Sequence, residues 1–142
     1  MQEKFLDELF EKIQDTTGIE DIGYHEIRDG RLYPIYKTKT NALAMEQWKN
    51  IHAQNVVYIE EHKILMKIAE EKEPIAISDV NSNELSSNAF FLFGIDSILV
   101  VPVIKSETLE GIICIASIEQ PHEFTLEEIK ECETLIKDYM NR

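Results

Sequence analysis

The sequence predicts an α+β fold in which a β-sheet built from hairpins is covered by helices on both faces. The runs at 97–104 and 111–118 are apolar at most positions, which is typical of strands buried from both sides. An Asp-Gly pair at 29–30 separates two aromatic-rich runs and indicates a tight hairpin. Amphipathic segments at both ends of the chain supply helices that can cover such a sheet.

Residues 1–15 form an amphipathic helix, which a Thr-Thr-Gly sequence ends. Its apolar side chains fall within one narrow arc: Phe5, Leu6, Leu9, Phe10 and Ile13. The next runs, 22–27 and 31–37, flank the Asp-Gly turn and are antiparallel strands. Pro34 places the second run at an edge of the sheet, because proline has no amide hydrogen to donate to another strand.

A helical period returns twice in the middle of the chain, at 40–52 and at 60–72. Pro74 stops the second of these helices. The segment 75–78 then forms a short strand that ends at Asp79. The apolar sides of these two helices are expected to pack against another apolar part of the fold.

The rest of the chain contains two helix signals. Aromatic side chains at helical spacing occupy 88–93, and Gly94 stands where a left-handed helix cap is expected. Thr125 and Glu128 form a capping box that opens a C-terminal helix over 125–142.

The composition is that of one soluble globular domain over residues 1–142. The chain carries 27 acidic against 14 basic side chains, a net charge of -13, so its average field repels nucleic acids and anionic membranes. Its longest apolar stretch, 98–104, is far shorter than the ~20 residues that span a bilayer. Because the acidic N-terminus also lacks the features of a signal peptide, we expect a cytoplasmic protein without direct nucleic-acid or membrane contact.

Cysteine and histidine usage predicts no preformed metal or redox site. Cys114 and Cys132 are too few for a disulfide framework or a four-ligand zinc site, and packing is the expected role of both. For Cys132 we expect a core or dimer contact, with a pKa raised by acidic neighbours. The four histidines lie on separate elements, so any metal or haem site must assemble in three dimensions. Among them, His25 and His52 are the two that can face a pocket.

Four phrases of the sequence resemble the GAF domain family over nearly the whole chain: KIAEEKEPIAISDV, FGIDSILVVPV, EGIICIAS and HEFTLEEIKECETLI. The resemblance implies a fold related to PAS domains, with a central antiparallel sheet. It further implies that the terminal helices, 1–15 and 125–142, pack on one face. The middle helices and loops are then expected to close a ligand pocket on the other.

Members of this family are typically regulatory sensors of small molecules or redox state, and most are not enzymes. This chain lacks the ordered Asn-Lys, Phe, Asp-Glu motif of cyclic-nucleotide-binding members. Neither of its cysteines matches the attachment cysteine of bilin-binding members, and it has none of the loop cysteines of free methionine sulfoxide reductases. We therefore expect no catalytic residues, no metal and no cofactor, and a ligand of unknown identity.

Under this layout, aromatic side chains of the middle segments form the pocket walls and a few polar groups orient the ligand. The predicted walls are Trp48, Tyr58 and Phe91, and the predicted polar contacts are Asp79, Asn88, Ser97 and Ser117. A second interpretation stays open, in which the aromatics fill the core and Asp79 and Asn88 only cap loops.

The function that the resemblance implies is a sensory domain in signal transduction, whose ligand alters the terminal helices. Expected partners are a small molecule, a second copy of the chain bound through those helices, and an effector domain or partner protein. Two alternatives remain: a thiol- or metal-based redox sensor or enzyme on the same fold, and a dimerisation module without a pocket.

Overall fold

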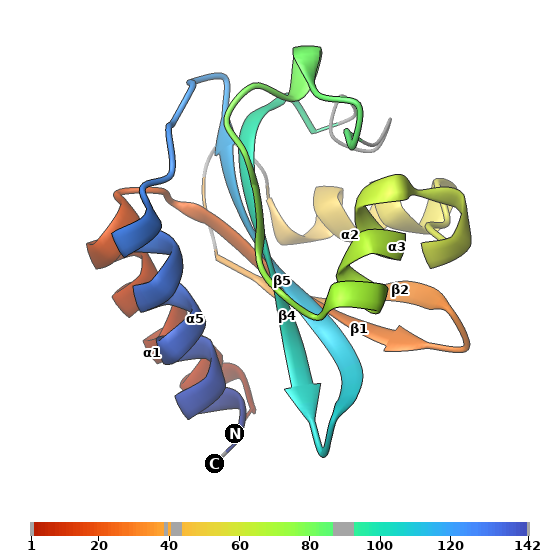
Figure 1. The fold of residues 1–142 in the computed structure, drawn as a ribbon, viewed down its shortest axis with the longest axis horizontal. Helices are drawn as coiled ribbons and strands as arrows, with labels where there is room; N and C mark the ends of the chain where they lie inside the picture. Colours follow the sequence, from red (N-terminus) through yellow and green to blue (C-terminus); the bar gives the residue numbers. More distant parts are fainter. Residues whose placement is uncertain (1, 39, 41–43, 87–92, 142) are drawn as a thin grey trace.

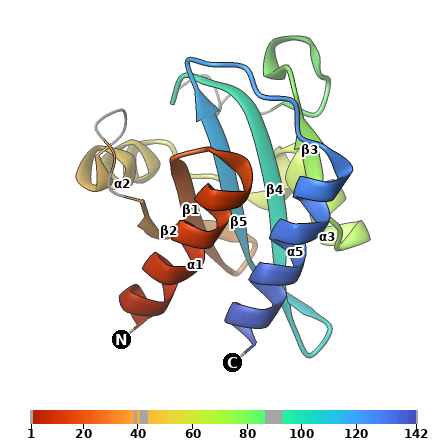
Figure 2. The ribbon, with the colours of Figure 1, turned by 90° about the vertical axis from the view of Figure 1, so that its left-hand side faces the viewer.

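The structure is a computed structural model that describes residues 2–38, 40, 44–86 and 93–141. A β-sheet lies between two helical layers (Figure 1). Helices α1 (Gln2–Thr17) and α5 (Leu126–Met140) lie side by side on one face, as Figure 2 shows. Helices α2 (Met45–Gln54) and α3 (Lys63–Glu71) lie on the other. The predicted α+β class and the placement of the terminal helices are confirmed.

The sheet has five strands in the order β2-β1-β5-β4-β3, and every neighbouring pair is antiparallel, as predicted. The strands are β1 (Asp21–Arg28), β2 (Arg31–Lys37), β3 (Ile75–Ile77), β4 (Ile95–Lys105) and β5 (Thr108–Ile118). The sheet therefore has β4 and β5 in its interior and β2 at an edge, where Pro34 requires it.

The Asp-Gly turn has the backbone that the hairpin prediction requires. Asp29 and Gly30 adopt φ values of 51° and 73°, which match the twist of the flanking strands. At the other end of the chain the capping box is present: Thr125 Oγ1 accepts from the Glu128 amide at 3.1 Å, and the Glu128 carboxylate accepts from the Thr125 amide at 2.9 Å.

Strands β4 and β5 alternate between two separate cores, which is why their sequences are apolar throughout. On β4, Leu99 and Val101 face α1 and α5, whereas Ile98 and Val100 face the opposite side. We call the side under α1 and α5 the closed face and the side under α2 and α3 the cavity face.

The middle helices begin later than predicted. The first starts at Met45, and the second divides into a 3-10 turn, η1 (Ile59–Glu61), followed by α3. Before the second helix, the chain pairs with the β1–β2 hairpin: the Leu32 amide donates to the Val57 carbonyl at 3.0 Å, and the Ile59 amide donates to the Gly30 carbonyl at 2.8 Å. The predicted helix at 88–93 lies outside the described residues apart from Phe93.

Among the described residues, no helix combines the length and apolar character needed to cross a bilayer.

Candidate functional site

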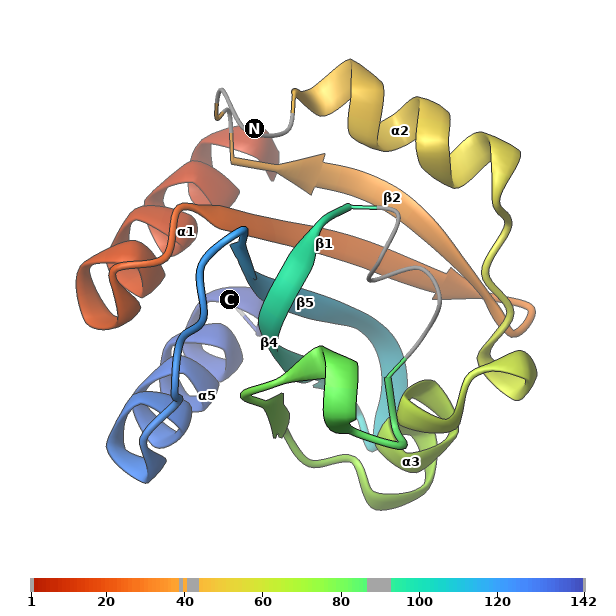
Figure 3. The same ribbon diagram turned by 90° about the horizontal axis from the view of Figure 1, so that it is seen from above.

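A cavity of about 80 Å³ lies on the cavity face, lined by residues of the sheet and of helices α2 and α3. Figure 3 shows where these two helices lie over the sheet. Its floor comes from the inner strands and includes Gly23, His25, Ile98, Val100, Ile112 and Cys114. Its cover comes from the middle of the chain and includes Trp48, His52, Val57, Ile64, Leu65 and Phe93. The walls are therefore predominantly aliphatic and aromatic, with a small number of polar groups.

Gly23 on β1 lets α2 approach the sheet closely. A Cβ atom at this position would lie 3.0 Å from Cζ2 of Trp48, which is tighter than almost all real contacts of this kind. The absence of a side chain on Gly23 thus makes room for the Trp48 indole. Trp48 is buried with 4% of its surface exposed.

Two histidines from different elements meet inside the cavity. Nε2 of His25, on β1, lies 3.0 Å from Nε2 of His52, on α2. Both side chains are buried. Burial, together with repulsion from His52, holds the pKa of His25 well below its usual value, and burial lowers the pKa of His52 to about 4. At neutral pH both rings are uncharged, so one donates a hydrogen bond that the other accepts.

The histidine pair sits among aromatic rings. The Trp48 ring lies 5.1 Å from the ring of His25 and 5.6 Å from that of His52, edge to face in both cases. The Phe93 ring is 5.1 Å from His52. Within the described residues, Nδ1 of His25 is buried and has no hydrogen-bond partner. The site therefore holds one buried polar atom that the surrounding protein groups leave unsatisfied.

A buried ion pair also contributes to the cavity lining. Lys37, with 2% of its surface exposed, places Nζ 3.3 Å from Asp21 Oδ1. Nζ also donates to the Thr38 carbonyl at 2.6 Å, and Thr40 Oγ1 donates to Asp21 Oδ1 at 2.6 Å. Burial lowers the pKa of Lys37 and the neighbouring Asp21 opposes that shift. The pair joins the start of β1 to the end of β2, and the two opposite charges compensate each other.

The structure separates the residues that were predicted to share a pocket. Trp48 lines the cavity. Tyr58 does not: it is 41% exposed and contributes to a separate surface depression with Ile59 and Met66. Phe91 and Asn88 lie outside the described residues.

The other three predicted polar contacts are engaged in loops and strand ends and do not line the cavity. Asp79 caps the short helix η2 (Val80–Ser82) by accepting from the Asn81 amide at 3.0 Å. Ser117 Oγ donates to the Gln120 carbonyl. Ser97 Oγ donates to the Ser78 carbonyl at 2.6 Å. For Asp79 this geometry is the loop-capping one that the sequence left open.

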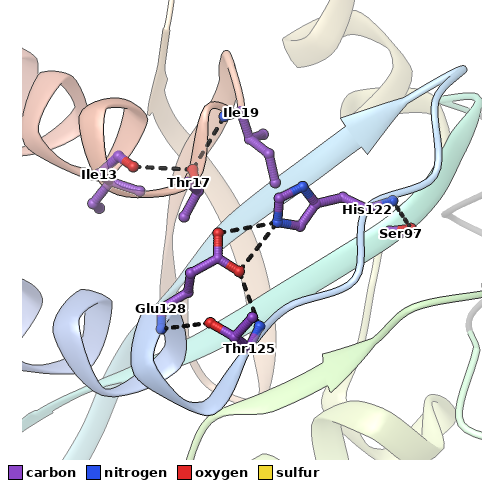
Figure 4. A network of polar contacts seen from close by, with 7 residues as sticks. All are labelled: Ile13, Thr17, Ile19, Ser97, His122, Thr125 and Glu128. Carbon is purple, nitrogen blue, oxygen red and sulfur yellow. Dashed lines mark hydrogen bonds and ion pairs between the residues drawn. The ribbon is translucent and has the colours of Figure 1, made fainter.

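Ser97 belongs to a polar network that connects β4 with the start of α5 (Figure 4). Its hydroxyl accepts from the His122 amide at 2.8 Å. Figure 4 shows the His122 ring pointing toward the Glu128 carboxylate, whose oxygens lie 3.2 and 3.3 Å from Nε2. Because Glu128 also closes the capping box with Thr125, the first turn of α5 is tied to the sheet.

The two thiols lie on opposite faces of the sheet, and burial raises the pKa of both. Cys114 lines the cavity, whereas Cys132 is fully buried in the closed-face core. Burial raises the pKa of each to about 12, and Glu128 and Glu131 add to the effect at Cys132, as the sequence predicted. Neither thiol is therefore a thiolate at neutral pH. In the part of the chain that the structure describes, no three or more His, Cys, Asp or Glu side chains are grouped to hold a metal ion.

Sequence reasoning identified both histidines as able to face a pocket but did not pair them. It missed Gly23 and Cys114 as floor residues. A signal for both missed positions existed in the period of two: Gly23 lies two residues before His25 on β1, and Cys114 lies two residues after Ile112 on β5.

Comparison with known proteins gives a consistent picture. The family profile described as GAF domain matches residues 3–136. A comparison with curated protein sequences gives no match. Among solved structures, a GAF domain/HD domain protein from Geobacter sulfurreducens is 13% identical with a TM-score of 0.80, covering 97% of this chain and 88% of that one.

Two further solved structures are similar over most of their length. The domain of a putative two-component sensor histidine kinase from Sinorhizobium meliloti has a TM-score of 0.72 at 15% identity, covering 99% of this chain and 89% of its own. A type II free methionine-R-sulfoxide reductase from Thermoplasma acidophilum has a TM-score of 0.65 at 16% identity, with coverages of 92% and 86%. At these identities the likeness shows a common fold.

Proposed function

This chain belongs to the GAF domain family, and from that premise we propose that it is a sensory domain that binds a small molecule between its sheet and helices α2 and α3. The observation that carries the proposal is the cavity with the His25–His52 pair. Concave, mostly apolar sites with a few buried polar groups are the usual form of small-molecule sites. The similar domain that belongs to a sensor histidine kinase protein of Sinorhizobium meliloti supports a role in signal transduction.

The output of this sensor is the pair of terminal helices. Strand β4 contributes Ile98 and Val100 to the cavity and packs against α5 on its other side. The network from Ser97 through His122 to Glu128 adds a polar link from the same strand. A ligand that favours one arrangement of β4 and α2 therefore shifts the position of α5 by mass action.

The remaining parts of the proposal follow from the same role. Helices α1 and α5 mediate homodimerisation and contact an effector domain or partner protein, and the domain works in the cytoplasm without a cofactor. It is not an enzyme: Cys114 and Cys132 both keep their protons at neutral pH, which argues against the thiol chemistry of the reductase with the same fold.

A thermal-shift screen read together with Trp48 fluorescence tests the proposal. Trp48 is the single tryptophan of the chain and lines the cavity, so its emission reports on that site alone. We expect a ligand that raises the melting temperature to change the emission as well. A control variant, Leu126→Gln, alters a side chain that is 77% exposed on α5 and is expected to leave both responses intact. Ligands that stabilise the protein without changing Trp48 emission would contradict the proposed site.

A further inference from the structure

We propose that the surface depression beside α3 docks a short segment of a partner protein, in which apolar side chains are flanked by lysine or arginine. The depression lies between the β1–β2 turn, η1 and the outer side of α3. Its described lining shares no residue with the cavity or with helices α1 and α5. The inference therefore goes beyond the ligand site and the helix contacts of the proposed function.

Exposed apolar side chains are concentrated at this depression. Four large apolar side chains are exposed among the described residues, and three of them come from one short stretch of chain: Val56, Tyr58 and Met66. Tyr58 and Met66 line the depression together with Ile59 and Ala69. Apolar side chains that gather at one place on a surface, with polar groups around them, mark a site of contact with another molecule.

Met66 departs from the pattern of its helix. Helix α3 buries Ile64, Leu65 and Ile68 toward the sheet, and an amphipathic helix carries polar side chains on its opposite side. Met66 lies on that opposite side and is 43% exposed, so this domain gains little from its apolar character. Methionine is flexible and polarisable, and it is common at surfaces that adapt to a bound peptide.

The walls of the depression are held in place by backbone hydrogen bonds. The Ile59 amide donates to the Gly30 carbonyl at 2.8 Å, and the Leu32 amide donates to the Val57 carbonyl at 3.0 Å. A surface that is already ordered loses less conformational entropy when a partner binds. The depression measures about 530 Å³, within the range of roughly 300–1,000 Å³ that holds ligands larger than a single small group.

The rim of the depression is acidic and uncompensated. Asp29, Glu60 and Glu70 line it, and no lysine or arginine is among its described lining residues. Within the described part of the chain, none of these three carboxylates takes part in an ion pair. Exposed carboxylates around an apolar floor attract a partner whose apolar side chains have cationic neighbours.

Neighbouring basic side chains do not neutralise this rim. The guanidinium groups of Arg28 and Arg31 lie over the Tyr33 ring, at 4.5 and 4.6 Å from its centre. Lys67 pairs with a glutamate of its own helix at 3.9 Å, and the exposed Lys63 does not line the depression. Since the whole chain carries a net charge of -13, its field favours a basic protein segment over nucleic acid or an anionic membrane.

Three labelled peptides test the chemistry of the partner: one in which lysine and leucine alternate, one with serine in place of leucine, and one with glutamate in place of lysine. Binding is followed through the backbone amide NMR signals of Gly30, Ile59 and Ala69. We expect the lysine–leucine peptide to shift these signals with a Kd on the order of 100 μM, because a short segment offers few contacts. The other two peptides are expected to bind at least about tenfold more weakly.

Variants of the full chain assign the contact. Met66→Ser removes an exposed apolar side chain and Glu70→Lys reverses a rim charge; each is expected to weaken binding of the lysine–leucine peptide by about fivefold. The matched controls are Leu126→Ser, an exposed apolar side chain on α5, and Glu123→Lys, which makes the same change in net charge outside the depression. Both controls are expected to bind like the wild type. If Met66→Ser does not fold, Glu70→Lys and its control decide.

Each contrary result overturns the proposal. A glutamate peptide that binds as tightly as the lysine peptide would show that the rim selects no charge. A serine peptide that binds as tightly would show only general attraction to an acidic chain. Equal weakening by Glu70→Lys and Glu123→Lys, or no amide shifts at millimolar peptide, would remove the docking surface and leave the ligand site in the cavity unaffected.

Discussion

The two faces of the sheet are made by the same alternating strands but differ in how completely they are filled. On the closed face, Leu9 and Phe10 of α1 and Ile136 of α5 are buried to 1% exposure or less, in one continuous apolar core. On the cavity face, α2 and α3 leave an opening and bring two histidines into an otherwise apolar interior. Voids and desolvated imidazoles reduce stability, so the cavity face carries a cost in stability that fits the binding role proposed for it.

The largest test of this difference compares two leucines. Leu9→Ala on the closed face is expected to lower the free energy of unfolding by about 4 kcal/mol, because tight packing there leaves the new space unfilled. Leu65→Ala borders the existing cavity and is expected to cost about 2 kcal/mol, since its side chain has fewer neighbours to lose. Urea unfolding measures both. Equal losses would mean that the two faces are packed alike.

The second test uses pH. The folded-state pKa of His52 is about 4 against an ordinary 6.5, so the unfolded chain binds a proton first as pH falls. The contribution of His52 to the free energy of unfolding is therefore fully present above about pH 6.5. It is lost as the pH falls from about 6.5 to 4, by an amount on the order of 3 kcal/mol. His25, whose pKa is also lowered, adds loss in the same direction.

The control for the pH test is a second histidine variant. Unfolding free energies measured from pH 7 to 4.5 should fall in the wild type and in His62→Gln, and should change much less in the double variant His25→Phe/His52→Phe. A double variant that keeps the wild-type slope would show that the pair is not the source of it.

The third test compares two glycines on neighbouring strands. Gly111→Ala places a Cβ 2.5 Å from the His25 carbonyl oxygen and 2.8 Å from the Tyr24 ring, so backbone must move; we expect a loss of about 3 kcal/mol. In Gly23→Ala the tightest contact of the new Cβ is with the Trp48 ring, at 3.0 Å, beside a cavity into which that ring can shift; the Lys37 Cβ lies at an ordinary 3.5 Å. We expect a loss of about 1 kcal/mol with a changed Trp48 emission. An unchanged emission spectrum would argue against the observed Trp48 position.

The smallest effect is a difference in thiol reactivity. With pKa values of about 12, both cysteines should be nearly inert at pH 7 in the native protein. A small methanethiosulfonate reagent, which converts a thiol to a mixed methyl disulfide with release of a sulfinate, should still modify Cys114, next to the cavity, faster than Cys132 in the closed core. Mass spectrometry over a time course measures the two rates, with Cys114→Ala as the control. Faster modification of Cys132 would contradict the closed face.

Periodicity in the sequence was sufficient for most of the fold. The closed-face stripe of α1, the capping box at Thr125 and the double-sided burial of β4 are local patterns, and each is confirmed. Local patterns could not predict the pairing of β1 with β5, because the paired residues are far apart in the sequence: Glu26 pairs with Gly111 and Asp21 with Ala116. The contact between His25 and His52 depends on how α2 docks on that sheet.

Two residues of the predicted site, Tyr58 and Ser117, lie outside the cavity because side chains alternate between the two sides of an extended chain. Residues 57 and 58 run extended beside the hairpin, so Val57 faces the cavity and Tyr58 faces solvent. The same alternation places Ser117 opposite Ala116, which lines the cavity. Applying a period of two at these positions would have removed Tyr58 and Ser117 from the predicted site.

The β1–β5 ladder also governs how the chain can reach this structure. The two hairpins, β1–β2 and β4–β5, close over short turns and are able to form early. Joining them requires residues 85 to 95 positions apart to meet, from Glu26 with Gly111 to Asp21 with Ala116, which carries a loop-closure entropy cost and slows folding. The cavity floor thus exists only once both halves of the chain have been synthesised, and a ribosome-bound N-terminal fragment has no binding chamber.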